Sequence, residues 1–183
     1  MFKLSKAALG SSLLSFVGVG SALAIYKFFI FTVQGGHQGV VFNKLSGIKP
    51  HSYREGWHIR LPYLEVPFVY ETRSKPKKFR SETPTRDLQN VNIELRILYK
   101  PMVEKLSELH RSLGPDYDER VLPSIVQEVL KSIVAQNNAA QLLSLREQIS
   151  LSIKEGLQRR GKDFFIQIDD VSITELTFTR EFQ

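Results

Sequence analysis

A run of twenty uncharged residues near the amino terminus, residues 7–26 (AALGSSLLSFVGVGSALAIY), most constrains how this chain can fold. An α-helix rises 1.5 Å per residue, so this run would form a helix about 30 Å long, enough to cross the hydrocarbon core of a bilayer. The apolar character resumes after Lys27 and continues to Val33, which a cleaved signal peptide does not need. The sequence therefore predicts an uncleaved membrane anchor over residues 1–33.

Two groups of side chains would carry this anchor. The first would face lipid and is aliphatic or aromatic: Leu13, Leu14, Phe16, Val17, Leu23, Ile25, Tyr26, Phe28, Phe29 and Ile30. The second is a stripe of small residues along one helix face, where another membrane helix could approach closely: Ser11, Ser15, Gly18 and Ala22. Small residues are also common in such segments without any packing role. A cleavable secretory signal is the alternative reading, because Ala22-Leu23-Ala24 resembles a cleavage site.

Charge is unevenly distributed along the chain. Residues 1–80 carry twelve Lys or Arg and three acids, a net charge of +9, whereas residues 81–183 carry thirteen and sixteen, a net charge of −3. Five positive charges fall within residues 73–80, which we expect to form a loop between strands. This loop would either contact lipid head groups through Lys75, Lys77, Lys78 and Arg80 or simply be solvated.

Residues 34–100 have the pattern of strands joined by turns. In residues 91–97 (VNIELRI) apolar and polar residues alternate, which predicts a strand with one buried face that Pro101 ends. Shorter strands are predicted at residues 40–42, 57–61 and 66–70. The last of these contains Pro67 and is expected at a sheet edge.

Residues 101–179 predict helices followed by extended chain. Apolar residues at helical spacing predict helices over residues 102–113, from about residue 122, and over residues 139–160. Residues 164–178 then alternate as a strand, with a phase slip near Asp169-Asp170 or Glu175 that suggests a bulge. The whole chain is thus predicted to be α+β, with a transmembrane helix, an antiparallel β-rich half and an α/β half.

The acids Asp116, Asp118 and Glu119 are the strongest catalytic candidates, but a helix start explains them better. Paired carboxylates act as acid and base when they converge on a pocket. Asp116 and Glu119 instead have the spacing of a capping box, and acids are favourable at a helix amino terminus. Pro123 is tolerated in a first turn, so the helix should begin near residue 122. Its apolar stripe would face the chain's own sheet, which we favour, or a neighbouring subunit.

No motif assigns catalytic chemistry, a cofactor or a metal to this chain. The four histidines, His37, His51, His58 and His110, are not spaced for a shared metal and are expected in turns or on the surface. The absence of cysteine excludes disulfides, thiol catalysis and thiolate metal sites. The basic run lacks the stacking aromatics of a nucleic-acid site, so no nucleic-acid partner is expected.

Three long runs resemble the prohibitins, which belong to the SPFH or Band 7 family. They are residues 116–125 (DYDERVLPSI) with 128–132 (EVLKS), residues 86–93 (RDLQNVNI) and residues 169–178 (DDVSITELTF). The resemblance is specific and covers most of the chain from about residue 33 to residue 182. Of the two prohibitin types, the second is matched better by Gly35-Gly36-His37, Phe42-Asn43 and residues 173–176.

The resemblance implies an SPFH domain over residues 34–179 in a non-enzymatic protein. It implies a single-pass protein of the mitochondrial inner membrane with its bulk in the intermembrane space. Such a protein would alternate with prohibitin-1 in a large ring, organise membrane lipid and protein, restrain membrane AAA proteases and support cristae. Residues 180–183 would begin the coiled-coil helix on which ring assembly depends.

The chain departs from the family pattern at two positions. Gln38 stands where the family usually has Arg, and His110 stands where prohibitin-2 has the aromatic residue that begins an autophagy-receptor motif. That receptor function is therefore not carried over. Two further classes stay open from the residues alone: an exported enzyme using residues 116–119, and a peripheral lipid- or RNA-binding module using residues 73–80.

Overall fold

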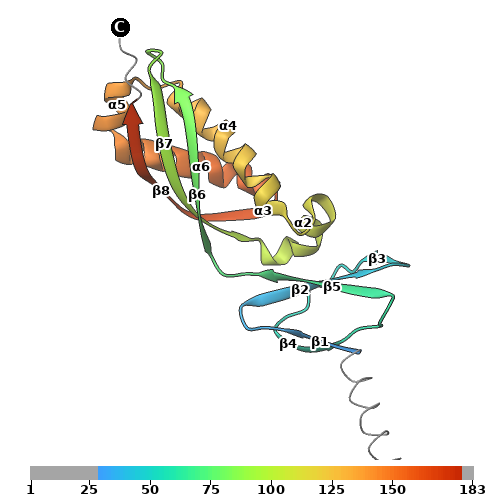
Figure 1. Ribbon diagram of the computed structural model, residues 1–183. Coiled ribbons are helices and arrows are strands. Elements are labelled where there is room, and N and C mark those ends of the chain that lie inside the picture. The colour runs from blue at the N-terminus through green and yellow to red at the C-terminus, as the bar shows by residue number, and fades with distance from the viewer. Residues whose placement is uncertain (1–28, 179–183) are drawn as a thin grey trace, which may run out of the picture.

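The computed structural model describes residues 29–178, which form two parts arranged in line (Figure 1). The first part, the β module, contains β1 to β5. The second part, the α/β module, contains β6 to β8 and the helices. The combination confirms the predicted α+β class, with strands first and helices with strands after them.

The β module is built from two small antiparallel layers. The pair β1–β4 and the sheet β3-β2-β5 comprise β1 (Ile30–Val33), β2 (His37–Asn43), β3 (Gly47–Ile48), β4 (Gly56–Ile59) and β5 (Glu65–Glu71). Phe31, Val33 and Val41 are buried between the layers, and Tyr53 packs against them. The predicted strand containing Pro67 is β5, and it lies at a sheet edge as expected.

The α/β module is a three-stranded antiparallel sheet in the order β6-β7-β8, with helices on one face. Its elements are β6 (Lys75–Pro84), β7 (Asn90–Pro101), the short 3₁₀ helix η1 (Val103–Lys105), α2 (Leu106–Leu113), α3 (Tyr117–Arg120), α4 (Leu122–Val134), α5 (Ala139–Ser144), α6 (Arg146–Asp163) and β8 (Ile166–Phe178). The alternation predicted for residues 91–97 is confirmed, because Val91, Ile93, Leu95 and Ile97 are each at most 2% exposed.

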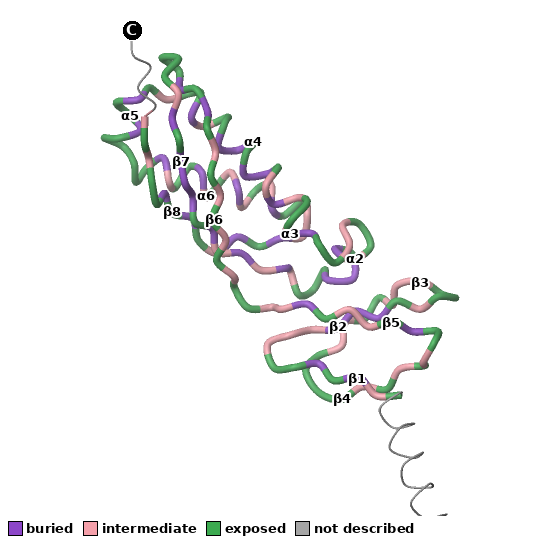
Figure 2. The backbone as a smooth tube through the Cα atoms, viewed as in Figure 1, coloured by how far each residue is buried: buried purple, intermediate pink, exposed green. Residues whose placement is uncertain are grey.

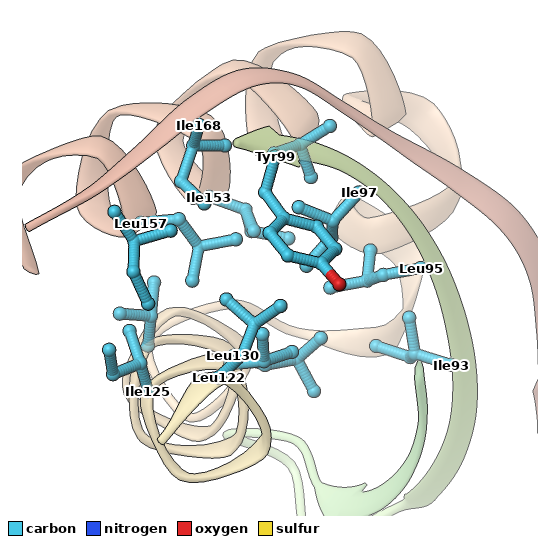
Figure 3. Packing of buried hydrophobic residues seen from close by; sticks show 14 of the residues in the cluster. Ile93, Leu95, Ile97, Tyr99, Leu122, Ile125, Leu130, Ile153, Leu157 and Ile168 are labelled. Atoms are coloured by element: carbon cyan, nitrogen blue, oxygen red, sulfur yellow. The ribbon is translucent and has the colours of Figure 1, made fainter. Parts of the chain in front are cut away.

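The main core lies between this sheet and the helices α4 and α6. Figure 3 shows the apolar residues of β7 directed toward Leu122, Ile125 and Leu130 of α4 and toward Ile153 and Leu157 of α6. The apolar stripe of α4 therefore packs on the chain's own sheet, which confirms the favoured interpretation. Pro123 lies in the first turn of α4, as predicted, and α3 forms a separate turn before it.

Two bulges keep the apolar side of β8 facing this core. The register shifts opposite Glu94/Leu95 and opposite Leu98/Tyr99, so that Thr174 and Asp169 are the extra residues on β8. The sequence predicted one slip, near Asp169-Asp170 or near Glu175, and the structure has a bulge at both places. Each extra residue restores the phase of a strand whose apolar positions are otherwise three residues apart.

Helix α2 joins the two modules. Leu106 and Leu109 are fully buried in one continuous cluster with Val40 of β2 and Tyr70 of β5. The hydroxyl of Ser107 also donates a hydrogen bond to the carbonyl of Pro50 at 3.2 Å. The β module is therefore packed onto the helices rather than only linked to them by the chain.

The anchor prediction is corrected at its carboxyl-terminal end. Residues 30–33, including Ile30, form strand β1, which pairs with β4 instead of continuing a helix. The strand is favoured because it buries Phe31 and Val33 in the small β-module core. The remaining anchor residues up to Phe28, and the small-residue stripe, lie outside the described residues, as does the coiled-coil start at 180–183. Across residues 29–178, none of the helices is both apolar and long enough to cross a bilayer.

Two further expectations from the sequence are wrong. The basic run at 73–80 is largely strand β6 and not a loop: it pairs with β7, and Lys75, Lys77 and Phe79 alternate onto the half-buried face that looks toward the helices. The single helix expected over 139–160 is two helices that break at Leu145 (φ −111, ψ 27). The carboxylate of Asp87 accepts a hydrogen bond from the backbone N–H of Ala139 and so fixes the start of α5, whereas α6 packs along β8. One straight helix cannot make both contacts.

Candidate assembly surface

One face of the β6-β7-β8 sheet is open, and its side chains are polar or charged. The helices α4 and α6 lie behind the opposite face (Figure 1). The strand register brings residues of all three strands together on the open face: Lys78, Arg80 and Glu82 of β6, Asn92, Glu94 and Arg96 of β7, and Ser172, Glu175 and Thr177 of β8. Nothing in the described part of the chain packs over this face, which we call the open sheet face.

Glu94 is the centre of an ion-pair network on the open sheet face. Its carboxylate lies 2.5 Å from Nε of Arg80 and 3.1 Å from Nζ of Lys78. The hydroxyl of Thr174, one of the two bulge residues, donates a hydrogen bond to the same carboxylate at 3.1 Å. Arg80 and then Lys78 lower the pKa of Glu94 to about 2. Glu94 is thus charged at neutral pH and is hidden beneath two exposed cations.

A shallow hollow of about 450 Å³ lies at one end of the open sheet face, toward the β6–β7 turn. Its lining combines charged and neutral polar groups with a single apolar side chain: Arg80, Ser81, Glu82, Asn92, Ile93, Glu94, Glu175 and Thr177. Glu82 and Glu175 make no ion pair with another described residue. The concave end is therefore mainly acidic, whereas Lys78 and Arg96 make the middle of the face basic.

The four basic residues predicted to contact lipid each have an acidic partner. Lys75 lies 3.1 Å from Glu71, and Lys77 lies 3.7 Å from Asp118. Lys78 and Arg80 share Glu94, as described above. These pairs reduce the net charge that this strand offers to an anionic surface. Lipid contact by Lys75, Lys77, Lys78 and Arg80 stays a prediction, and their ion pairs weigh against it.

The acids at residues 116–119 have structural partners. The carboxylate of Asp118 accepts a hydrogen bond from the hydroxyl of Tyr99 at 2.7 Å, beside its ion pair with Lys77. Asp116 immediately precedes α3, as predicted, but its ψ of 34° is not extended and its side chain makes no capping bond. The capping box expected with Glu119 is therefore absent. One forms instead between Asn138 and Gln141 at the start of α5.

His110 differs most from its sequence-based expectation, because it lies at the junction of the modules and not on the surface. Its Nδ1 lies 2.5 Å from the hydroxyl of Tyr70, and its ring stacks 4.4 Å from that of Phe68. Burial lowers the pKa of His110 and raises the pKa of Tyr70 to about 12, so both groups are neutral at pH 7. No local pattern around residue 110 could have revealed partners forty residues away.

Metal-ligating side chains are not gathered at one place in residues 29–178. His, Asp and Glu residues do not cluster in threes there with the geometry of a metal site. His37 lies in β2 at the module surface, and His58 packs its ring 5.4 Å from Phe31. The surface with the most convergent charged groups is thus the open sheet face.

Comparison with known proteins places the chain in a family. The model of the SPFH domain / Band 7 family matches residues 31–183, and the chain belongs to this family. Within it, the sequence is that of a prohibitin-family member and is most like prohibitin-2, which confirms the resemblance seen in the three runs.

Relatives from distant organisms support this placement. The chain is 46% identical over 175 residues to prohibitin-2 of Xenopus tropicalis, covering 95% of this chain and 58% of that protein. It is 50% identical over 182 residues to prohibitin-2 of Dictyostelium discoideum, covering 98% and 61%. It is 46% identical over 168 residues to a protein of Arabidopsis thaliana named prohibitin-1, mitochondrial, covering 91% and 58%. The chain thus spans about three fifths of the length of these relatives.

Proposed function

We propose that this chain is a non-enzymatic scaffold subunit that assembles with prohibitin-1 into a ring at the mitochondrial inner membrane. In this proposal a single N-terminal segment anchors the chain, and its bulk lies in the intermembrane space. The ring would organise membrane lipid and protein, modulate membrane AAA proteases and support cristae. The family and the mitochondrial relative support this role in outline, and the finer parts follow from the resemblance.

The observation that carries the proposal is the open sheet face. A sheet normally buries one face and can leave the other wet, but this face combines a basic middle with an acidic hollow. Opposite charges placed apart on one surface favour a partner in a fixed orientation and disfavour other orientations. A contact between unlike surfaces of neighbouring subunits, repeated by rotation, closes into a ring. The face therefore suits side-by-side assembly.

The test is native sizing of detergent extracts from cells that express the chain with or without prohibitin-1. We expect a large species that needs prohibitin-1. Arg96→Glu combined with Glu175→Lys reverses both regions of the open sheet face and should shift most of the protein to a smaller species. A monomer-sized species under every condition would contradict the proposal.

A matched control keeps this result interpretable. Lys131 is exposed on α4, on the helical side of the module, so Lys131→Glu changes charge without touching the open sheet face. This variant should assemble as the unchanged protein does. Sequencing the amino terminus of the mature protein tests the exported-enzyme alternative: a start at Ile25 would show that the anchor is cleaved off and would contradict the proposal, whereas an intact amino terminus would exclude a cleaved signal.

A further inference from the structure

The two outer strands of the sheet β6-β7-β8 differ in how their free edges are finished. In an antiparallel sheet, alternate residues of a strand direct their backbone N–H and C=O groups toward the neighbouring strand and away from it. Within the described residues, β6 and β8 each have β7 as their one neighbour. Half of the backbone groups of each outer strand therefore point outward, where another group can bond them.

Helix α6 closes the edge of β8. The even-numbered residues of β7 bond to β8, since the N–H of Met102, just after the strand, donates to the carbonyl of Phe165 at 2.9 Å. Residues of β8 that lie opposite odd-numbered residues of β7 thus point outward. Three of their carbonyls accept hydrogen bonds from α6: Ile168 from Gln158 at 3.1 Å, Val171 from Ser150 at 3.2 Å and Ile173 from Arg146 at 2.5 Å. This edge is therefore not available to another strand.

The turn after β6 shows which residues of β6 point outward. The backbone N–H of Thr85 donates to the carbonyl of Gln89 at 2.9 Å, so the odd-numbered residues bond to β7. The register between β6 and β7 then runs evenly along the whole of β6. The even-numbered residues therefore direct their backbone groups outward. They are Pro76, Lys78, Arg80, Glu82 and Pro84.

The two prolines bound a window of open backbone. Proline has no N–H, so Pro76 and Pro84 cannot donate to a further strand. Between them, the outward N–H and C=O groups of Lys78, Arg80 and Glu82 have no partner in the part of the chain that the structure describes. The side chains of Lys78 and Arg80 are 67% and 81% exposed. Proline and lysine at an edge deter pairing with long strands, and here they leave residues 78–82 open to a short one.

The charge along this window selects what can pair with it. Lys78 and Arg80 share the single carboxylate of Glu94, so together they keep a positive balance. Arg96 lies opposite Lys78 on β7 and adds a third cation to the same face. A strand placed beside β6 would set alternate side chains next to Lys78 and Arg80, where acids are favourable and bases are not. The edge therefore suits an extended segment with acids at alternate positions.

A second copy of the chain does not fit this edge in a common membrane. β6 leaves the β module at Lys75 and runs toward the opposite end of the molecule (Figure 1). A copy paired antiparallel through its own β6 would direct its β module, and the segment before it, to that opposite end. The two N-terminal segments could not then enter one bilayer. The edge of β8 in a second copy is closed by α6, as described above.

We propose that the outer edge of β6 is a docking site for an extended acidic segment of another protein, which adds a fourth strand to the sheet. Backbone hydrogen bonds to Lys78, Arg80 and Glu82 hold the segment, and the two cations select its acids. The exclusion of a second copy rests on the anchoring part of the proposed function, whereas the open edge does not. The site lies along the edge of the sheet and does not need the ring.

Hydrogen exchange tests this pairing directly. The probe is a blocked synthetic heptapeptide of alternating valine and glutamate, added to the full chain in nanodiscs without prohibitin-1. We expect saturating peptide to slow amide exchange at Lys78, Arg80 and Glu82 by about tenfold or more, because these N–H groups become bonded. Unchanged exchange at these residues would overturn the proposal. Slow exchange before peptide is added would also overturn it, because a second copy would then cover the edge.

Binding of labelled peptides, followed by fluorescence anisotropy, tests the selection by charge. The same heptapeptide with lysine in place of glutamate should bind about tenfold more weakly or worse, since like charges would lie side by side. Affinity for the glutamate peptide should fall as salt is added. Equal affinity for the two peptides would contradict an acidic partner.

A pair of variants at one position separates backbone pairing from charge. Glu82→Pro removes an outward N–H, which an edge strand tolerates, and should weaken binding of the glutamate peptide about tenfold. Glu82→Gln removes the same acid but keeps the N–H, so it should bind at least as well as the unchanged protein. Equal binding by the two variants would contradict strand addition.

A modified peptide makes the same test without changing the protein. Methylation of the backbone nitrogens that face β6 removes the hydrogen-bond donors of the glutamate peptide and keeps its side chains. This peptide should not bind, and the result does not depend on how Glu82→Pro folds. Binding as tight as that of the unmodified peptide would show that side-chain charge alone holds it and would refute the docked strand.

Discussion

At the scale of single residues, Glu94 is a carboxylate that is buried and yet ionised at neutral pH. Its side chain is 7% exposed, whereas those of Arg80 and Lys78, which cover it, are 81% and 67% exposed. Exposed ion pairs contribute little to stability in general, but a carboxylate that holds two cations and a threonine hydroxyl forms a network. The network ties β6, β7 and the second bulge of β8 to one another.

The first prediction is that Glu94→Gln lowers the midpoint temperature of unfolding at pH 7. The folded-state pKa of Glu94, about 2, lies below the ordinary value of 4.5. Its charge therefore stabilises the fold fully above about pH 4.5, and this stabilisation is lost as the pH falls toward 2. The difference in midpoint temperature between the two proteins should shrink over that range in thermal scans.

A neighbouring glutamate provides the control for this measurement. Glu82 of β6 lies on the same face of the sheet as Glu94 and has no ion-pair partner within residues 29–178. Glu82→Gln should change the midpoint temperature little and should show no comparable pH dependence. A difference for Glu94→Gln that stays constant from pH 7 to pH 2 would contradict the assigned pKa.

At the scale of elements, helices α4 and α6 approach closely because α6 carries a glycine at their contact. A Cβ atom added to Gly156 would lie 2.7 Å from Cγ1 of Val129. Valine in a helix has one strongly preferred rotamer, so it cannot move aside cheaply. The contact thus has a specific requirement for a missing side chain.

The second prediction concerns this contact. Gly156→Ala should destabilise the protein by about 1–2 kcal/mol, because overpacking outweighs the gain of about 1 kcal/mol in helix propensity. Val129→Ala removes the clashing methyl group, so the double variant should be more stable than the sum of the single effects. Chemical denaturation of the four proteins completes the cycle. Additive effects would show that the helices are not in contact at this point.

The elements differ in how far sequence alone could predict them. Strand β7 and helix α4 were predictable, because their alternating or helical apolar pattern reflects the face they bury. A bulge in β8 was also predictable from the phase slip in its apolar positions, but the sequence left its place open between two stretches, and the strand register shows a bulge at each. Strand β6 was not, because Lys75 and Lys77 occupy inner positions with paired charges, and a basic run resembles a solvated loop.

The surfaces were less predictable than the elements. The break at Leu145 depends on Asp87 of a distant turn, and the Tyr70–His110 contact joins residues of different modules. The exposure of Trp57 and Ile59 in β4 (Figure 2) was not predictable, because the two residues alternate with polar residues in the way an ordinary half-buried strand does. Only the packing of Phe31 and Val33 showed which side of that strand pair is covered.

At the scale of the whole molecule, two modules share one hydrophobic core through α2. Leu109 of α2 is fully buried in one cluster that contains Val40 of β2 and the core residues of the α/β module. A shared core makes the modules unfold together, since neither can lose α2 without exposing the other. The junction therefore fixes how the two modules are oriented relative to each other.

The third prediction is that Leu109→Ala weakens this coupling. The cavity should cost about 2–5 kcal/mol and should separate a single thermal transition into two, seen by calorimetry of detergent-solubilised protein. Leu157→Ala is the matched control, because Leu157 is equally buried but lies inside the α/β module. It should lower the temperature of one undivided transition. Two transitions in the unchanged protein would contradict the coupling.

The in-line arrangement of the modules has an electrostatic consequence. Strand β1 and the carboxyl-terminal end of β8 lie at opposite ends of the molecule (Figure 1), and β7 alone, with twelve residues, spans roughly 40 Å. With the N-terminal segment anchored in a bilayer, as the proposed function has it, the end of β8 lies several Debye lengths from the head groups, since that length is about 8 Å at physiological ionic strength. Polypeptide that emerges there is insulated from the surface potential of the membrane. Its encounters would be insensitive to lipid charge, although the opposite end of the same domain adjoins the anchoring segment.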